Sequence, residues 1–189
     1  MPAAIQVEKT KLKQPPLEIH TLGDRALRQP AKRVAKVDDE IRSLVREMLQ
    51  TMYSADGIGL AAPQVAVNKQ LLVVDVDPEN AAAPPLVLIN PQIIKISQEL
   101  ATGQEGCLSI PGVYLDVVRP AALEVSYKDE NGRPKKLQAS DLLARCILHE
   151  MDHLTGVLFV DRVENALALN QELKKHGFYA KDVQPVTVK

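Results

Sequence analysis

The chain has 189 residues and a formal net charge of −1, with 46% hydrophobic and 25% charged residues. This length and composition suit one globular domain with a substantial core. The near-neutral charge argues against a protein that mainly grips nucleic acid, and no apolar run is long enough to span a membrane. The two cysteines, Cys107 and Cys146, are too few for a disulfide-stapled secreted scaffold, so a reducing cytoplasm is the simplest location.

The N-terminal segment is polar and rich in lysine, and it ends in Pro15-Pro16. We expect residues 1–16 to form an extended or disordered arm, residues 17–177 a single domain and residues 178–189 a mobile tail. The first residues lack the apolar stretch of a signal peptide and the Arg- and Ser-rich composition of a transit peptide.

The first predicted helix spans residues 38–54. Its apolar residues recur every three or four positions, which predicts one buried face. Asp38 is placed to cap the N-terminus, and Asp39 and Glu40 follow in the first turn, where negative charge is favourable. Gly57 is placed to end the helix. We assign this helix to the core.

The middle of the chain carries short strands separated by turn residues. The predicted strands are residues 70–77, 86–90, 92–96, 114–118, 122–128 and 136–139. Asn131-Gly132, between the last two, predicts a hairpin. Before the strands, residues 57–64 predict a glycine-containing turn, which either joins helix to strand or lets a ligand approach the backbone.

Two further helices follow the strands. Ser140 is placed to cap the first and Gly156 to end it, and the second spans about residues 162–176. The second is amphipathic, and one stripe along it comprises Val163, Ala166, Leu167, Asn170 and Leu173. Strands and helices without regular βαβ alternation predict an α+β fold. We expect small antiparallel or mixed sheets around a central helix, with an N-terminal and a C-terminal helix.

The segment His149-Glu150-Met151-Asp152-His153 carries the strongest functional pattern. On a helix, His149 and His153 lie on one face, where both imidazoles can bind one metal ion. Glu150 lies about 100° further round the helix axis, near the metal without being forced onto it. A carboxylate there can take a proton from water bound to the metal.

Two histidines do not complete a metal site. Cys107 is the best candidate for a third ligand, although a single cysteine is more often a small buried apolar residue. Cys146 lies three residues before His149 on the same predicted helix. The two cysteines and two histidines would make a Cys₂His₂ set, the composition of closed structural zinc sites. Three ligands with an open position give Glu150 a role, so we favour catalysis over the closed site.

Three segments together resemble the signature motifs of peptide deformylases, in the family's order. They are residues 57–64 (Gly-Ile-Gly-Leu-Ala-Ala-Pro-Gln), 105–109 (Glu-Gly-Cys-Leu-Ser) and 149–156 (His-Glu-Met-Asp-His-Leu-Thr-Gly). The similarity extends from about Leu17 to the last helix. Residues 109–120 resemble the branch found in plant plastids and cyanobacteria. Without a transit-like leader, this implies a cytoplasmic bacterial enzyme of cyanobacterial type.

The resemblance implies a metal-dependent hydrolase that removes the formyl group from formyl-methionine at the N-terminus of nascent polypeptides and releases formate. It implies Cys107, His149 and His153 as metal ligands, and Glu150 as the general base and acid. The usual metal of the family is Fe(II), and zinc, nickel or cobalt can occupy the same site. Fe(II) beside a thiolate predicts sensitivity to oxygen.

The resemblance also assigns the Gln64 side-chain amide and the Leu108 backbone N–H to the oxyanion that develops on the attacked formamide. It implies an apolar slot for methionine and a peptide backbone bound edge-on to strand segments. The substrate-binding residues would be Ile58, Gly59, Gly112, Tyr114, Leu142 and Cys146. Cys146 then changes from candidate ligand to pocket wall.

Two other functions are compatible with parts of the sequence. An HExxH metallopeptidase shares the helix, but a Cys107 ligand and the upstream motifs argue against it. A non-catalytic zinc module on the ribosome would use the closed Cys₂His₂ set. We expect formyl-Met nascent peptides and, transiently, the ribosome as partners, with no membrane or direct nucleic-acid role. Glu105 and Arg119 can pair to brace the Cys107 loop, although an exposed Arg119 is equally consistent with the sequence.

Overall fold

A computed structural model describes residues 5–186 of the protein. Residues 1–4 of the predicted arm and 187–189 of the predicted tail lie outside the described residues. The strands are β1 (Gly59–Ala61), β2 (Leu71–Val74), β3 (Leu86–Ile96), β4 (Leu100–Cys107), β5 (Ile110–Pro120), β6 (Ala122–Lys128) and β7 (Pro134–Ser140). The α-helices are α1 (Asp39–Ser54), α2 (Asp141–His153) and α3 (Ala166–Lys175). The short 3-10 helices are η1 (Arg25–Arg28), η2 (Ala62–Val65), η3 (Phe159–Arg162) and η4 (Ala180–Asp182).

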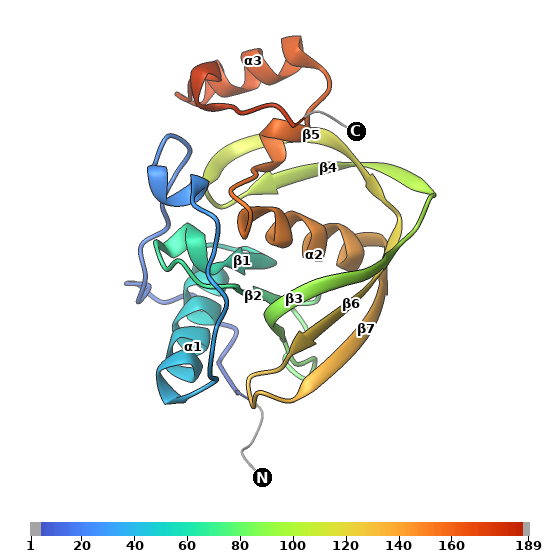
Figure 1. Cartoon of the computed structure of the whole chain (residues 1–189). Helices are drawn as coiled ribbons and strands as arrows, with labels where there is room; N and C mark the ends of the chain where they lie inside the picture. Colours follow the sequence, from blue (N-terminus) through green and yellow to red (C-terminus); the bar gives the residue numbers. More distant parts are fainter. Residues whose placement is uncertain (1–4, 187–189) are drawn as a thin grey trace.

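The strands form two antiparallel sheets. Five of them make a sheet in the order β1-β2-β3-β6-β7, and β4 and β5 form a separate two-stranded ribbon. Helix α2 lies in the centre of the molecule between the larger sheet and the ribbon, with α1 beside β1 and β2 and α3 over β5 (Figure 1). The predicted α+β fold around a central helix is confirmed. No helix among residues 5–186 is both long and apolar enough to cross a membrane.

Helix α1 begins and ends almost where the sequence predicts. The Asp38 side chain accepts a hydrogen bond from the Ile41 N–H at 3.0 Å and so caps the first turn. The apolar face of α1 packs against β1 and β2. The left-handed residue that follows the helix is Asp56 (φ +57°), one position before the predicted Gly57. The Gly57 N–H donates to the Met52 carbonyl oxygen at 2.9 Å.

Helix α2 packs its apolar side chains against β2, β3 and β6 of the larger sheet. Ser140 stands at the N-cap position, but its hydroxyl donates to the Asp141 carboxylate at 2.9 Å and accepts no backbone N–H. The predicted capping bond is therefore wrong. Gly156 follows the helix with φ +75°, and a Cβ there would lie 2.7 Å from the Arg28 carbonyl oxygen. Only glycine fits this position without displacing the backbone of η1.

Several predicted strand boundaries are wrong. Residues 86–90 and 92–96 form one strand, β3, which continues through a bulge where its register with β6 shifts between Ile89 and Gln92. The sequence does not predict β1 or β4, because glycines and polar residues interrupt their apolar pattern. The Asn131-Gly132 hairpin is confirmed, since β6 and β7 pair along their whole length.

Helix α3 starts later than predicted. Arg162 belongs to η3, and the Asn165 side chain caps α3 by accepting a backbone N–H of its first turn at 3.0 Å. With this start, Leu169 and Leu173 are buried against β5, whereas Leu167 of the predicted stripe is exposed. The predicted stripe is therefore right at Leu173 and wrong at Ala166, Leu167 and Asn170, because the buried face of the helix passes through Leu169.

The chain returns to the domain after α3. The Arg28 side chain donates to the Asp182 carbonyl oxygen at 2.7 Å, and the Val186 N–H donates to the Asp161 carbonyl oxygen at 2.9 Å. Arg28 also pairs with the buried Asp161 carboxylate. The described part of the tail is therefore attached to the domain, and its mobility in solution stays a prediction.

The N-terminal segment has neither helix nor strand from residue 5 to residue 16, yet it contacts the domain closely. Lys9 Nζ lies 2.6 Å from Asp75 Oδ2, and only 8% and 3% of the two side chains are exposed. The same ammonium donates to the carbonyl oxygens of Asn80 and Ala83 at 2.9 and 2.7 Å. Tyr53 adds a hydrogen bond to Asp75 at 2.7 Å. One buried lysine thus joins the arm to the loop after β2.

We predict that Lys9→Met lowers the free energy of unfolding by about 3 kcal/mol at pH 7, because the Asp75 charge stays buried without its partner. Burial alone would raise the pKa of Asp75, but hydrogen bonds from Lys9 and Tyr53 hold it below its usual value. The stabilisation is therefore present above about pH 4 and is lost as the pH falls through the lowered pKa. Urea unfolding across this pH range should show the difference between the two proteins shrinking toward acid pH.

Lys11→Met is the matched control. Lys11 pairs with Asp56 at the surface, where 63% and 70% of the two side chains are exposed, so its loss should change the unfolding free energy little. Equal losses in the two variants, or a loss at Lys9 that is independent of pH, would contradict the buried pair as the cause.

Candidate metal centre

Cys107 stands at the tip of the β4–β5 ribbon. It pairs with Ile110, so Leu108 and Ser109 alone form the turn between the two strands. The turn is held from outside by the Leu22 N–H, which donates to the Ser109 carbonyl oxygen at 2.9 Å. A two-residue turn anchored in this way fixes where the Cys107 side chain points.

The Cys107 sulfur meets the two histidines of α2. Cys107 Sγ lies 3.4 Å from His153 Nε2, and one ligand atom from each of Cys107, His149 and His153 lies within 4.8 Å of the others. The two imidazole centroids are 5.2 Å apart, as expected one helical turn apart. A sulfur and two nitrogens at these distances suit one divalent metal ion. No other such group of three occurs in the part of the chain that the structure describes.

Glu105 orients the first histidine. Glu105 Oε1 lies 3.0 Å from His149 Nδ1, which makes Nδ1 the donor and leaves Nε2 for the side facing Cys107. Burial alone would lower the pKa of His149, but hydrogen bonds with Cys107 and Glu105 raise it well above its usual value. The raised pKa favours a second proton on the ring, at Nε2, and a cation bound at Nε2 would compete with it. Burial lowers the pKa of His153 well below its usual value, so this ring is neutral and can bind a metal.

Glu105 also belongs to a buried ionic network that joins the ribbon to α2. Arg119 Nε lies 3.0 and 2.9 Å from the two Glu105 oxygens, and Arg119 Nη1 lies 2.8 Å from Asp152 Oδ2 on α2. Burial alone would raise the pKa of Glu105, but hydrogen bonds from His149 and Arg119 lower it to about 2. The predicted Glu105–Arg119 pair is confirmed. The alternative of an exposed Arg119 is wrong, since only 4% of it is exposed.

Glu150 lies buried beside the histidines, and its Oε2 has no hydrogen-bond partner among residues 5–186. Burial raises the pKa of Glu150 to about 7, against the opposing effect of His149. Gly59 lies directly against this carboxyl, because a Cβ at that position would lie 2.4 Å from Glu150 Oε1. A carboxyl group in such surroundings can accept and return a proton near neutral pH.

Gln64 is buried in η2, and its amide is held at both ends. The oxygen accepts the Ala61 N–H at 2.8 Å, and Nε2 donates to Ser109 Oγ at 3.1 Å and lies 3.5 Å from Cys107 Sγ. The Gln64 carbonyl oxygen also accepts the His20 N–H at 2.8 Å. These partners place the amide nitrogen beside the cysteine of the metal cluster.

A cleft of about 630 Å³ opens onto the cluster. Cys107, His149, Glu150 and Leu108 lie in its wall. All six predicted substrate-binding residues also line it: Ile58, Gly59, Gly112, Tyr114, Leu142 and Cys146. Gln64 and His153 do not line the cleft, but both are buried and contact the Cys107 sulfur, at 3.5 and 3.4 Å. The structure therefore brings every predicted site residue to one place.

Cys146 is not part of the metal cluster. Its sulfur lies 3.5 Å from the Ile58 carbonyl oxygen, and a Cβ on Gly59 would lie 2.9 Å from it. Burial raises the pKa of Cys146 well above its usual value, which disfavours the thiolate that metal binding requires. This geometry favours the three-ligand set over the closed Cys₂His₂ set.

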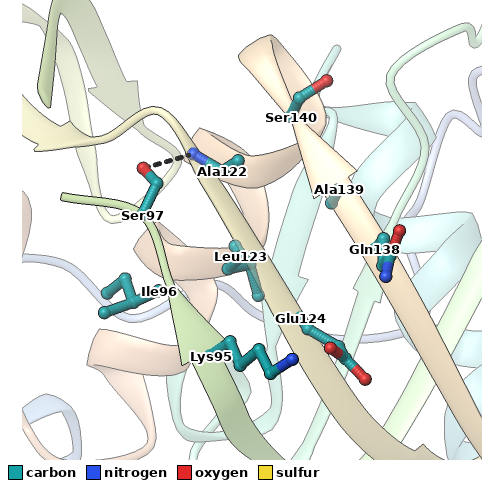
Figure 2. Close-up of a pocket in the computed structure, with 9 residues that line it drawn as sticks. All are labelled: Lys95, Ile96, Ser97, Ala122, Leu123, Glu124, Gln138, Ala139 and Ser140. Carbon is teal, nitrogen blue, oxygen red and sulfur yellow. Dashed lines mark hydrogen bonds between the residues drawn. The ribbon is translucent and has the colours of Figure 1, made fainter. Parts of the chain in front are cut away.

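A second hollow, of about 470 Å³, is lined by residues of β3, β6 and β7 and by Ser97 (Figure 2). Lys95, Glu124 and Gln138 provide its long polar side chains, and the Ala122 N–H donates to Ser97 Oγ at 3.1 Å. None of the lining residues is a histidine or a cysteine. The chemistry therefore assigns the site to the cleft at Cys107.

Sequence reasoning missed the residues that support the site. Ser109 holds the Gln64 amide, and Asp152 closes the network through Arg119. Arg145 donates to the carbonyl oxygens of Ala101 and Val117 at 2.7 and 2.9 Å, which attaches the ribbon to α2. The only sequence signal was that Ser109 and Asp152 fall inside the second and third motifs.

Comparisons with known proteins show the family to which the chain belongs. Residues 16–168 match a family model described as polypeptide deformylase. The chain is 68% identical to the peptide deformylase of Microchaete diplosiphon, over 98% of this chain and 100% of that one. It is 67% identical to the peptide deformylase of Thermosynechococcus vestitus, over 98% of this chain and 99% of that one.

Solved structures give the same result. A crystal structure of a peptide deformylase from Synechococcus elongatus in complex with actinonin has a TM-score of 0.96 and 67% identity, covering 97% of this chain and 100% of that one. Peptide deformylase 1B from Arabidopsis thaliana has a TM-score of 0.78 and 40% identity, covering 84% of this chain and 90% of that one. The chain therefore belongs to the polypeptide deformylase family, in its cyanobacterial branch.

Proposed function

We propose that Cys107, His149 and His153 hold one divalent metal ion in this protein and that Glu150 is the general base and acid. The observation that carries the proposal is the convergence of the three ligand atoms within 4.8 Å of one another. The buried Glu150 Oε2 beside them, which has no hydrogen-bond partner in the described part of the chain, supports its role. As a member of its family, the protein is a metal-dependent hydrolase that removes the N-formyl group from nascent peptides.

The side chains divide the hydrolysis between them. A divalent cation in the site lowers the pKa of water and polarises the formyl carbonyl. Glu150 takes a proton from the attacking water and returns it to the departing nitrogen. The water oxygen joins the formyl carbon, the carbon–nitrogen bond breaks, and the products are formate and the free α-amino group of methionine. Glu105 keeps the His149 ring in one orientation throughout.

We assign the oxyanion of the attacked carbonyl to the Gln64 side-chain nitrogen and the Leu108 backbone N–H. The Gln64 oxygen is already bonded to Ala61, so its two N–H groups are directed to the side of Cys107 and Ser109. Leu108 follows Cys107 in the anchored turn. Donors fixed before the substrate arrives need no reorganisation during the reaction, which is the main source of their effect.

Strand β1 supplies a free edge for the peptide backbone. The Asp75 N–H donates to the Ile58 carbonyl oxygen at 2.8 Å, and Leu60 pairs with Val73, so these two residues of the segment face β2. Because backbone polar groups alternate along a strand, those of Gly59 face the cleft. We propose that the nascent chain binds here as an added antiparallel strand. Recognition through the backbone accepts many sequences.

We assign the methionine side chain to the part of the cleft lined by Ile58, Leu142 and Cys146. These are apolar walls, and Cys146 with its raised pKa behaves as a small neutral residue. Gly112 and Tyr114 lie across the cleft and would contact the peptide beyond its first residue.

We infer that the metal in the cell is Fe(II), the usual metal of the family, and that zinc, nickel or cobalt can replace it. A thiolate with two imidazoles suits both iron and zinc. Fe(II) beside Cys107 makes oxidation of the sulfur or loss of metal the expected route of inactivation in air. Since the substrate is a chain leaving the ribosome, we place the enzyme in the cytoplasm in transient contact with the ribosome.

We predict that Glu150→Gln lowers kcat by roughly 10²–10⁴-fold and keeps one bound metal ion, because glutamine preserves size but cannot accept the proton. Cys107→Ala should lose both metal and activity. Metal analysis of anaerobically purified proteins, combined with formate release from formyl-Met-Ala-Ser, measures both. Full turnover by Glu150→Gln would remove its assignment as general base. Cleavage of unformylated peptides by the unmodified enzyme would instead support a metallopeptidase.

Gln64→Leu should lower kcat by roughly 10²–10³-fold with the metal content unchanged, because one oxyanion donor is lost. Ser109→Ala is the matched variant. It keeps the amide but removes one of its anchors, so its loss of kcat should be smaller. Steady-state kinetics on formyl-Met-Ala-Ser test both, and an unaltered kcat in Gln64→Leu counts against the oxyanion role.

Cys146→Ala should retain one metal ion per chain, since the Cys146 sulfur lies outside the metal cluster. The measurement is metal stoichiometry after dialysis against a chelator, with Cys107→Ala as the variant that loses the ion. Loss of metal from Cys146→Ala would favour the closed structural-zinc site.

A further inference from the structure

Another pocket, distinct from the hollow on β3, β6 and β7, continues the cleft beyond Gly57. It encloses about 580 Å³, and Asp56 and Gly57 line both the pocket and the cleft. One of its walls is the N-terminal arm at residues 8–11, and another is the loop after β2, through Pro78, Glu79 and Ala81. The arm therefore helps to shape a surface that is continuous with the active-site cleft.

A single buried lysine holds these two walls together. Lys9 on the arm binds Asp75 at the end of β2 and the carbonyl oxygens of Asn80 and Ala83 in the loop. Asp75 is fixed in turn by the Tyr53 hydroxyl. Because this side chain of the arm bonds to the opposite wall, the two walls are held together by residues of the chain itself.

A peptide bound along β1 would run from the metal centre to this pocket. An antiparallel partner of β1 runs from Gly59 toward Gly57, away from Glu150, so if the first residue lies opposite Gly59 the third lies opposite Gly57. At Asp56 the backbone becomes left-handed (φ +57°) and leaves the line of the strand. From its fourth residue the peptide loses the β1 edge and meets the mouth of the pocket.

Among the described residues that line the pocket, the charged side chains without an ion-pair partner are negative. Lys9 is paired with Asp75, and Lys11 is paired with Asp56. Glu8 and Glu79 also line the pocket, are exposed, and have no ion-pair partner within the described residues 5–186. Two free carboxylates beside neutralised lysines attract cationic side chains.

We propose that this pocket is a subsite for the fourth to sixth residues of the nascent chain and that Glu8 and Glu79 favour lysine or arginine there. The proposal rests on the deformylase reaction proposed for the adjoining cleft. It adds a charge preference to an enzyme whose binding along β1 depends on the backbone alone.

The test compares formate release from three substrates: formyl-Met-Ala-Ser and two formyl-Met hexapeptides carrying either lysine or glutamate at positions four to six. We expect kcat/KM of the unmodified enzyme to be about 3- to 10-fold higher for the lysine hexapeptide at low salt, the range of one or two exposed ion pairs. The ratio should approach one at high salt. It should also approach one in the double variant Glu8→Gln/Glu79→Gln, mainly through KM.

Glu164→Gln is the matched control, because it removes an exposed carboxylate outside the pocket lining. It should keep the lysine preference, which separates a local effect from the net charge of the protein. A ratio of one in the unmodified enzyme, or an unchanged ratio in the double variant, overturns the subsite. Formyl-Met-Ala-Ser is too short to reach the pocket and should be turned over equally by all three proteins. Failure of the unmodified enzyme on that short peptide would overturn the proposed reaction itself.

Discussion

The proposed metal site depends on one buried arginine, Arg119, which connects strand β4, where Cys107 lies, to helix α2, where the two histidines lie. Arg119 binds Glu105 on β4 and Asp152 on α2, and Glu105 holds His149. Burying one of these charges without its partner is unfavourable, so the network favours the docking of ribbon and helix in which Glu105, Arg119 and Asp152 meet. Cys107 lies two residues after Glu105 on the same strand. The meeting of its sulfur with the histidines is therefore a consequence of the docking that the ionic network selects.

More of the proposed site than of the strand boundaries could be predicted from the sequence. Two histidines four residues apart share a helix face whatever the rest of the chain does, so local geometry placed His149 and His153 together. Cys107 is 46 positions from His153, so residue type alone made it a candidate ligand, and only the resemblance of whole motifs decided between the three-ligand set and the closed Cys₂His₂ set. Strands β1 and β4 escaped prediction because pairing with a neighbouring strand, more than side-chain pattern, makes them strands.

Long-range polar contacts were the least predictable feature. The composition of residues 1–16 is typical of a solvated segment, yet Lys9 is buried against Asp75, 66 positions away in the sequence. Ser109 likewise looked like an ordinary motif residue until the fold brought Gln64 within 3.1 Å of it. Local propensity describes how a segment behaves alone. It cannot predict a hydrogen bond or ion pair with a residue that is distant in the sequence and is brought close only by the tertiary structure.

The absence of a side chain at Gly59 serves both binding and chemistry. A Cβ there would lie 2.4 Å from Glu150 Oε1 and 2.9 Å from Cys146 Sγ, so any larger residue would displace the proposed base and narrow the methionine slot. Glycine also lets a peptide backbone come within hydrogen-bond distance of β1. The lining that keeps water from Glu150 is what raises its pKa to about 7, and a bound peptide would exclude still more water. In the proposed mechanism, backbone recognition and proton transfer thus meet at Gly59, whereas Leu60 and Ala61 of the same strand are buried in the core.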